Sequence, residues 1–303
     1  MSIVFSFAKV HADNKCGVDM ITTLAPFAQY QDTLWSGAVE VFCFGDSFPG
    51  EKNPDWTLKY IKDRETFEQN VGNEDATIIR RLPEIGVTLG VRKFAAPSPI
   101  EFCGRIANPN HLTEEISWCG ITVRRGVTAD GCIVPVGEGY VLSAAGCAAI
   151  IARRRSDGEV IAAHAGLRSL NRAPDPGHVE FKNVVTSIVE MLGTDIDVQV
   201  VLPIDPEQFT YPLNHEDPVL AKKNRQRRQI FVAKYGHKAV PGPRAEGRND
   251  IRHIIAYHFK REGTSGNRVK VGPTTKEVQG FYTTRDESPR NTRRNLILVV
   301  RRY

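Results

Sequence analysis

A cysteine and a histidine stand in two neighbouring runs of small residues. Cys147 lies in the sequence LSAAGCAAII and His164 in VIAAHAG, and the turn-forming sequence SDGE separates the two runs. Cysteine and histidine act together as nucleophile and general base in thiol enzymes, and both are metal ligands. Small neighbours allow a ligand to approach the backbone closely. The plainer interpretation is a buried thiol and a hydrogen-bonded core histidine.

The two runs are expected to form a β-hairpin with SDGE as its turn. A two-residue turn at the centre of SDGE pairs positions whose numbers add to 315, so Cys147 would face Arg168 rather than His164. Contact between the thiol and the imidazole therefore requires a bulge or a strand that curls at its end. The glycines close to both residues permit such a distortion.

Three other side chains could join this pair. His111 lies in the loop sequence NPNHLTEE, and one cysteine with two histidines is a normal set of three zinc ligands that leaves a fourth position for water or substrate. Arg168 could hold a phosphate with both terminal nitrogens, and Asp130 could orient an imidazole or act as a base. The plainer interpretations are a surface histidine, a surface ion pair, and a cap for the turn ADG, which we favour for Asp130.

The segment around these residues resembles the core of the laccase-domain family, also called the YfiH-like or polyphenol-oxidase family. Members carry an aspartate before a strand, an A-D-C motif, and H-A-G-W-R-G ahead of a long helix. The matching positions are Asp130, Cys147, His164, Ala165, Gly166 and Arg168. His111 falls where the family's upstream histidine should be, and the C-terminal segment resembles the family's last motif with Arg285 and Arg294 aligned. The sequence therefore resembles a divergent member.

The resemblance implies an α+β fold, an α/β/β/α sandwich of mixed sheets like that of the cytotoxic necrotizing factors. It implies zinc, rather than copper, bound by His111, Cys147 and His164. The implied enzyme is cytoplasmic and acts on a purine nucleoside, by phosphorolysis or by deamination of adenosine, with Arg168 and Arg285 binding phosphate. The older oxidase activity is disfavoured because none of the eight histidines forms the H-x-H pair of multicopper oxidases.

The sequence departs from the family pattern around the expected ligands. Gly146 replaces the aspartate of A-D-C, and Leu167 and Ser169 replace the tryptophan and the last glycine of the histidine motif. Because such neighbours tune metal ligands, two alternatives stay open. One is a metal-free Cys-His amidohydrolase or deamidase, against which the presence of a third histidine argues. The other is a catalytically degenerate protein that binds a nucleoside or a metal.

Hydrophobic patterns predict the elements that position these residues within one domain, residues 1–303. The expected helices are 56–72, 178–193, 218–236 and 249–263. The expected strands are SIVFSF, AVEVFCF, GITVRRGVTADG, GYVLSAA, AAIIARR, VIAAHAG, DVQVVLP and NLILVVRR. Besides SIVFSF and the first residues of AVEVFCF, residues 1–40 are expected to be irregular, as are residues 92–110, and residues 239–249 are expected to form a loop excursion.

The composition is that of an ordinary globular chain, with 303 residues, 41% of them hydrophobic, and a net charge of +5. This charge suits an anionic ligand, and nucleic acid is not expected, because the basic run AKKNRQRR has no aromatic residue that could stack a base. No apolar run approaches the roughly 20 residues that span a bilayer, and the first residues are too polar for a secretory signal. The six cysteines form no C-x-x-C pair, so we expect reduced thiols in a cytoplasmic protein.

Overall fold

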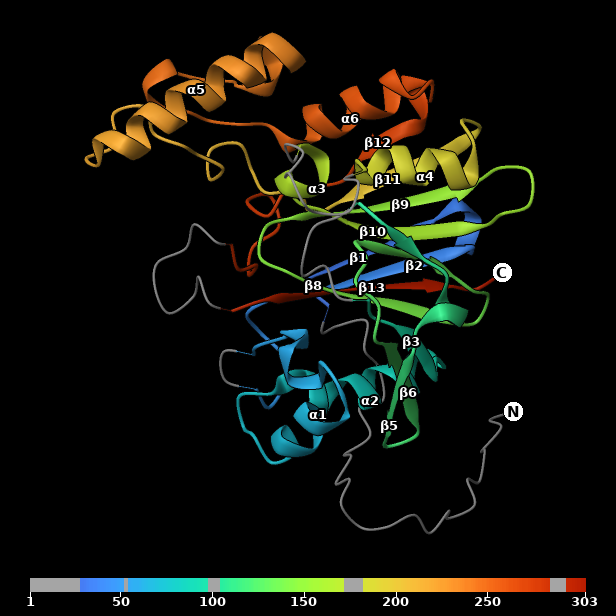
Figure 1. Ribbon diagram of the computed structural model, residues 1–303. Coiled ribbons are helices and arrows are strands. Elements are labelled where there is room, and N and C mark those ends of the chain that lie inside the picture. Colours follow the sequence, from blue (N-terminus) through green and yellow to red (C-terminus); the bar gives the residue numbers. More distant parts are fainter. Residues whose placement is uncertain (1–27, 52–53, 98–103, 172–181, 284–292) are drawn as a thin grey trace, which may run out of the picture.

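Two mixed β-sheets pack face to face, and helices cover the outer face of each sheet (Figure 1). The computed structural model describes residues 28–51, 54–97, 104–171, 182–283 and 293–303. Buried hydrophobic side chains form three clusters, one between the sheets and one between each sheet and its helices. The expected α/β/β/α sandwich is confirmed.

The first sheet has seven strands in the order β1-β2-β13-β8-β3-β6-β5. They are β1 (Tyr30–Leu34), β2 (Val39–Phe44), β3 (Lys93–Ala95), β5 (Glu114–Trp118), β6 (Ile121–Arg125), β8 (Gly139–Ala144) and β13 (Asn295–Arg301). Strand β3 runs parallel to β6 and β8, and the other neighbours are antiparallel. The end of β8 leads directly into the small-residue run that contains Cys147.

The second sheet has six strands in the order β12-β11-β9-β10-β7-β4. They are β4 (Ile106–Ala107), β7 (Gly131–Val134), β9 (Ala148–Arg154), β10 (Val160–Ala165), β11 (Ile196–Val201) and β12 (Val269–Val271). The hairpin β9–β10 occupies its centre, so Cys147 lies just before a central strand and His164 lies within the next one.

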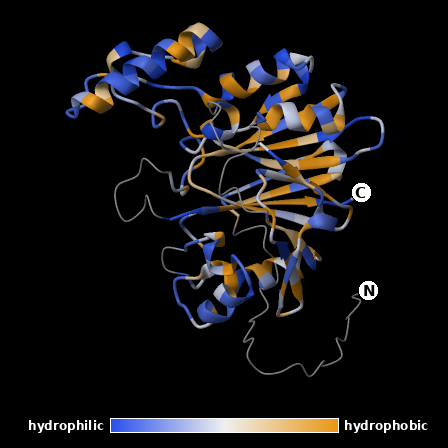
Figure 2. Cartoon of the chain, in the orientation of Figure 1, coloured by the Kyte–Doolittle hydropathy of each residue, from blue (hydrophilic) through white to orange (hydrophobic). Residues whose placement is uncertain are grey.

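Helices of two groups enclose the sheets (Figure 1). The α-helices are α1 (Arg64–Asn70), α2 (Thr77–Leu89), α3 (Leu167–Asn171), α4 (Val184–Leu192), α5 (Pro218–Tyr235) and α6 (Ile251–Arg261). Short 3-10 turns are η1 (Trp35–Gly37), η2 (Leu58–Ile61), η3 (Pro109–His111), η4 (His237–Ala239), η5 (Arg244–Glu246) and η6 (Gly266–Arg268). Helices α1 and α2 lie on the first sheet and α4 and α6 on the second. Figure 2 shows that α5, at the edge of the molecule, is largely hydrophilic.

The expected helix over 56–72 is divided into η2 and α1. The division has a local cause, because the Asp63 carboxylate accepts a hydrogen bond from the Thr66 backbone N–H and starts a new helix. Helix α2 was not predicted because Pro83 lies inside it. The carbonyl of Ile79, which the missing N–H of proline leaves free, accepts a hydrogen bond from the indole of Trp118 at 2.8 Å instead. A distant side chain thus stabilises a helix that its own sequence disfavours.

The prediction that residues 1–40 are irregular is wrong for β1, and residues 92–110 contain β3, β4 and η3. The strand SIVFSF and residues 178–181 lie outside the described residues. Helix α4 begins after Asn183, whose side chain accepts a hydrogen bond from the Val185 backbone N–H. The predicted α5, α6, β9, β10, β11 and β13 are confirmed to within a few residues, and the excursion 239–249 contains η5.

Cys119 is disulfide-bonded, whereas Cys43, Cys132 and Cys147 are free thiols. The expectation that the cysteines are all reduced is therefore wrong for Cys119. Within the portion of the chain that the structure describes, no helix has the length and apolarity needed to cross a bilayer.

The core between the sheets is expected to dominate stability. Leu142 on β8 is 1% exposed and belongs to this cluster. Leu142→Ala should lower the free energy of unfolding by about 2–5 kcal/mol, because it leaves a cavity between two sheets that cannot collapse freely. The matched control Leu220→Ala, at a position 41% exposed on α5, should change it by less than about 0.5 kcal/mol. Urea unfolding measures both, and equal losses would contradict this assignment of the core.

Candidate active site

The hairpin brings Cys147 and His164 together through a register that differs from the expected one. Paired positions on β9 and β10 have numbers that add to 313, with His164 opposite Ala149 and Ala165 opposite Ala148. The connection spans residues 155–159 rather than two residues. Cys147 thus lies one position beyond the last pair, beside Gly166 and diagonal to His164. Contact therefore needs no bulge.

Gly166 provides the space in which the two side chains meet. A Cβ atom at this position would lie 2.8 Å from Cε1 and 3.3 Å from Nε2 of His164, and 3.3 Å from Sγ of Cys147. Sulfur and imidazole therefore both border the empty side-chain position of one glycine. Any larger residue would separate them.

Cys147, His164 and Asp130 form a hydrogen-bonded series. The Cys147 thiol bonds to the imidazole, and Nδ1 of His164 lies 3.4 Å from Oδ1 of Asp130. His164 and Asp130 are 4% and 1% exposed, and Cys147 is half-buried. The arrangement has the order of a nucleophile, a base and an orienting carboxylate.

Asp130 is held from several directions. Its carboxylate accepts hydrogen bonds from the Gly104 backbone N–H at 2.5 Å and from the Ser169 hydroxyl at 2.9 Å. Its backbone carbonyl accepts one from the His164 N–H at 2.6 Å. The interpretation that we favoured, a cap for the ADG turn, is therefore wrong. Ser169, which the sequence presented only as a departure from a family motif, is fully buried and positions this carboxylate.

The surroundings of Cys147 and His164 favour a negative charge on the thiol and a positive charge on the imidazole. Burial alone would raise the pKa of the Cys147 thiol, but the adjacent imidazole of His164 outweighs burial, and with help from Arg294 it lowers that pKa below its ordinary value. Burial alone would lower the pKa of His164, but the Cys147 thiolate and the Asp130 carboxylate outweigh it and raise the pKa to about 9. Both shifts favour the thiolate–imidazolium form of the pair.

The other described free thiols have the opposite character. Burial raises the pKa of Cys132 to about 12 and that of Cys43 well above its ordinary value. At Cys132 burial outweighs the attraction of Arg124, and a thiol with a raised pKa is a poor nucleophile. Among the free cysteines that the structure describes, only Cys147 is activated.

A pocket of about 220 Å³ opens over Cys147. Its apolar walls come from Leu167, Ile204, Phe209, Tyr211 and Ile251. Arg168, the second residue of α3, is the one charged side chain among the described residues that line it. Gly146 forms its edge with φ +88°, and a Cβ there would lie 3.2 Å from Ile204. The positive φ turns the chain so that Cys147 faces the pocket.

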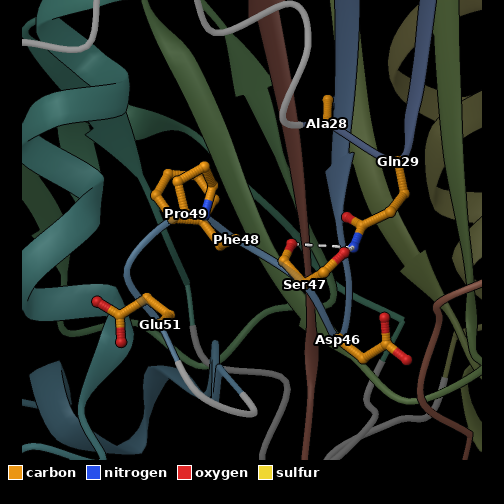
Figure 3. Close-up of a pocket in the computed structure, with 7 residues that line it drawn as sticks. All are labelled: Ala28, Gln29, Asp46, Ser47, Phe48, Pro49 and Glu51. Atoms are coloured by element: carbon orange, nitrogen blue, oxygen red, sulfur yellow. Dashed lines mark hydrogen bonds between the residues drawn. The ribbon is translucent and has the colours of Figure 1, made fainter.

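A larger hollow of about 390 Å³ lies beside β2 and is lined by residues between Ala28 and Glu51 (Figure 3). There the amide of Gln29 donates to the Ser47 hydroxyl at 2.8 Å, and Glu51 pairs with Arg80 and Arg81. The carboxylate of Glu51 is thus already neutralised, and neither Cys147 nor His164 lines this hollow. The pocket over Cys147 is the better candidate for chemistry.

The third expected zinc ligand does not join the Cys147–His164 pair. His111 ends η3 and is exposed to solvent, and among the described residues no three His, Cys, Asp or Glu side chains are placed to hold a metal. Cys147 and His164 alone supply two of the three protein ligands of an open zinc site. This donor set does not fit the metal that the resemblance implied. Arg285, the other expected phosphate ligand, lies outside the described residues.

The sequence did not predict that residues of the segment 204–211 line the pocket over Cys147. Phe209 and Tyr211 follow β11 in the sequence LPIDPEQFTY, and their rings contact edge to face at 5.5 Å. The signal was available, because two aromatic residues in a proline-containing loop that follows a strand suit a pocket wall. It was overlooked because the segment matched no motif.

Fold and site together define an α/β/β/α protein with a cysteine, a histidine and an aspartate at the end of a central hairpin. Similar solved structures are those of a hypothetical protein YfiH from Bacillus licheniformis, a Neisseria meningitidis protein of the DUF152 family, and YlmD from Geobacillus stearothermophilus. The first has a TM-score of 0.61 at 15% identity, over 92% of this chain and 98% of that chain. The second has a TM-score of 0.57 at 15% identity, over 89% and 97%. The third has a TM-score of 0.56 at 16% identity, over 92% and 94%. The fold is thus that of the YfiH-like proteins, as the resemblance implied. No protein-family model and no curated protein matches the sequence.

The space at Gly166 gives a direct test of the pair. Gly166→Ala should disrupt the thiol–imidazole contact, because the new methyl group would overlap the ring of His164. The ultraviolet absorbance of the Cys147 thiolate at neutral pH should then be lost. Gly72→Ala, where nothing lies within 4 Å of the added atom, should leave it intact. An unchanged thiolate in Gly166→Ala would show that the pair does not depend on this space.

Proposed function

We propose that this protein is a metal-independent thiol hydrolase that cleaves a carboxamide, an amidohydrolase or deamidase. Cys147 is the nucleophile, His164 the acid and base, and Asp130 and Ser169 position the imidazole. The observation that carries the proposal is the buried Cys147–His164–Asp130 series, with a lowered thiol pKa, beneath a pocket. The third histidine, which argued against this function, does not join the pair.

The chemistry follows from the two charges. The Cys147 thiolate attacks the carboxamide carbon and forms a C–S bond, and the imidazolium of His164 gives its proton to the amide nitrogen as the C–N bond breaks. Ammonia leaves, and a thioester remains on Cys147. The neutral imidazole then removes a proton from water, which attacks the thioester. The C–S bond breaks, the carboxylic acid leaves, and the thiolate and imidazolium are restored.

The pocket over Cys147 favours a substrate that carries a primary carboxamide on an aliphatic stem, as a glutamine side chain does. A volume of about 220 Å³ accommodates such a group, and apolar walls bury the stem while the polar groups lie at one end, beside Cys147. Arg168 at the rim would favour a substrate that carries a negative charge nearby. A cytoplasmic location remains a prediction.

Purine nucleoside chemistry is the second proposal. Phosphorolysis of a nucleoside, or deamination of adenosine, is supported by the YfiH-like fold, by Arg168 as a phosphate ligand, and by the aromatic rings of Phe209 and Tyr211 as a surface for a base. The residues that would supply zinc for it do not fit, so no step through a metal is derived. A degenerate protein that binds a nucleoside without turnover is the remaining alternative.

One set of assays separates these proposals. Release of ammonia from glutamine-containing peptides should depend on Cys147 and be abolished in Cys147→Ala, with a thioester on Cys147 trapped by acid quench and mass spectrometry. Cys43→Ala, which removes a free thiol outside the site, should retain activity. In parallel, inosine and phosphate are assayed for free base. Base release that survives in Cys147→Ala would refute the hydrolase and support the second proposal.

A further inference from the structure

A third pocket, of about 400 Å³, lies between α5 and the segments on either side of it. Helix α5 contributes Arg225 and Arg228, η5 contributes Arg244, and η4 contributes His237. No carboxylate is among the described residues that line it. The pocket therefore concentrates positive charge without an internal counter-charge.

Two of the arginines are fixed toward the pocket by backbone groups. One terminal nitrogen of Arg225 donates to the carbonyl of Leu213 at 2.8 Å, and one of Arg228 donates to the carbonyl of Val240 at 3.4 Å. A guanidinium has five N–H groups, so each arginine keeps donors for a ligand. Within the described chain, no ion pair joins Arg225, Arg228 or Arg244 to a carboxylate, although Glu246 beside them is paired with Arg248.

The rest of the lining indicates what else the ligand carries. Leu213, Val232 and Ala233 provide an apolar surface next to the arginines. Inorganic phosphate would leave this surface unused, and a nucleic acid would find no aromatic side chain for stacking among the described lining residues. Planar guanidinium groups match the oxygens of a phosphate. We propose that this pocket binds an organic phosphate monoester whose organic part is compact and apolar.

The pocket is separate from the candidate active site. The two share no lining residue, although Tyr211 lines one and Leu213 the other. Tyr211 is covered on its ring face by Arg227, which lies 3.8 Å from the ring centroid and lines neither pocket. The proposal therefore does not depend on the function of Cys147.

Calorimetric titration with phenyl phosphate at low ionic strength tests the proposal, with inorganic phosphate and benzoate as partial probes. Phenyl phosphate should bind one per chain and more tightly than either probe, and its affinity should fall as salt is added. Arg228→Gln/Arg244→Gln should weaken it at least about tenfold. The control Lys222→Gln/Lys223→Gln makes the same charge change on exposed positions of the same helix and should weaken it less than about twofold.

Four results would overturn the proposal. The first is no binding of phenyl phosphate, and the second is an equal loss of affinity in the two double variants. The third is tighter binding of an acidic peptide than of phenyl phosphate. The fourth is protection of Cys147 from iodoacetamide by phenyl phosphate, which would place the ligand in the pocket over Cys147. If the Arg228→Gln/Arg244→Gln protein does not fold, Arg244→Gln alone, at an exposed position in η5, takes its place.

Discussion

His164→Ala should slow the alkylation of Cys147 by iodoacetamide at pH 6.5 at least about tenfold. Burial is the largest influence on this thiol and raises its pKa, and the imidazole of His164 is what reverses that effect. With the imidazole removed, burial acts alone and the pKa moves above its ordinary value. Because only the thiolate reacts, each unit of pKa changes the rate near neutral pH about tenfold. Peptide mass spectrometry measures the rate at Cys147 separately from the other cysteines.

The control for this experiment is His253→Ala. His253 lies on α6, and its Nε2 lies 3.1 Å from the carbonyl oxygen of Tyr235, away from Cys147. This variant should keep the alkylation rate of the wild type. A His164→Ala protein that is folded and still reacts at the wild-type rate would mean that something other than the imidazole activates the thiol.

Asp130→Asn should lower the free energy of unfolding by about 2–4 kcal/mol. The carboxylate accepts hydrogen bonds from the Gly104 N–H and the Ser169 hydroxyl in a buried position next to His164. An amide offers one acceptor where the carboxylate offered two, so its N–H₂ group would meet another donor. The exposed control Asp75→Asn should be close to wild type. Urea unfolding of the two variants measures this difference.

The same variant should change the titration of His164. The Asp130 carboxylate raises the pKa of the imidazole, so its loss should bring that pKa down from about 9. The sign is fixed, because an imidazolium without its anion is less stable than neutral imidazole in a buried place. Nuclear magnetic resonance of the imidazole Cε1 proton follows the titration. An unchanged pKa together with unchanged stability would show that Asp130 is not a member of the series.

The fold could be predicted further than the site. The motif around Cys147 and His164 was enough to predict the sandwich, and the proline and glycine residues beside α5 and α6 gave their bounds to within about two residues. The prediction failed where distant contacts override local preference. The clearest case is α2, in which Trp118 bonds to the carbonyl that Pro83 leaves free.

The sequence predicted the pair that the structure brings together, but not the register or the other side chains that hold it. The residue pattern located Cys147 and His164, but the register depended on a connection of five residues, which the sequence SDGE does not specify. The resemblance suggested His111 as a third ligand, and only the structure shows that it is exposed to solvent in η3. Ser169 and Gly104 reach Asp130 from opposite directions along the chain, so their convergence required the three-dimensional structure.

The most direct test is the thiolate absorbance of the wild-type protein near 240 nm as a function of pH, with Cys147→Ala subtracted and excess chelator present. The structure predicts a Cys147 thiolate signal at pH values below the ordinary thiol pKa, lost only as the pH falls through the lowered pKa of Cys147 and unaffected by the chelator. A signal that appears only above pH about 8.5, the ordinary thiol value, would contradict the thiolate–imidazolium pair. A signal that the chelator removes would mean that the thiolate is a metal ligand.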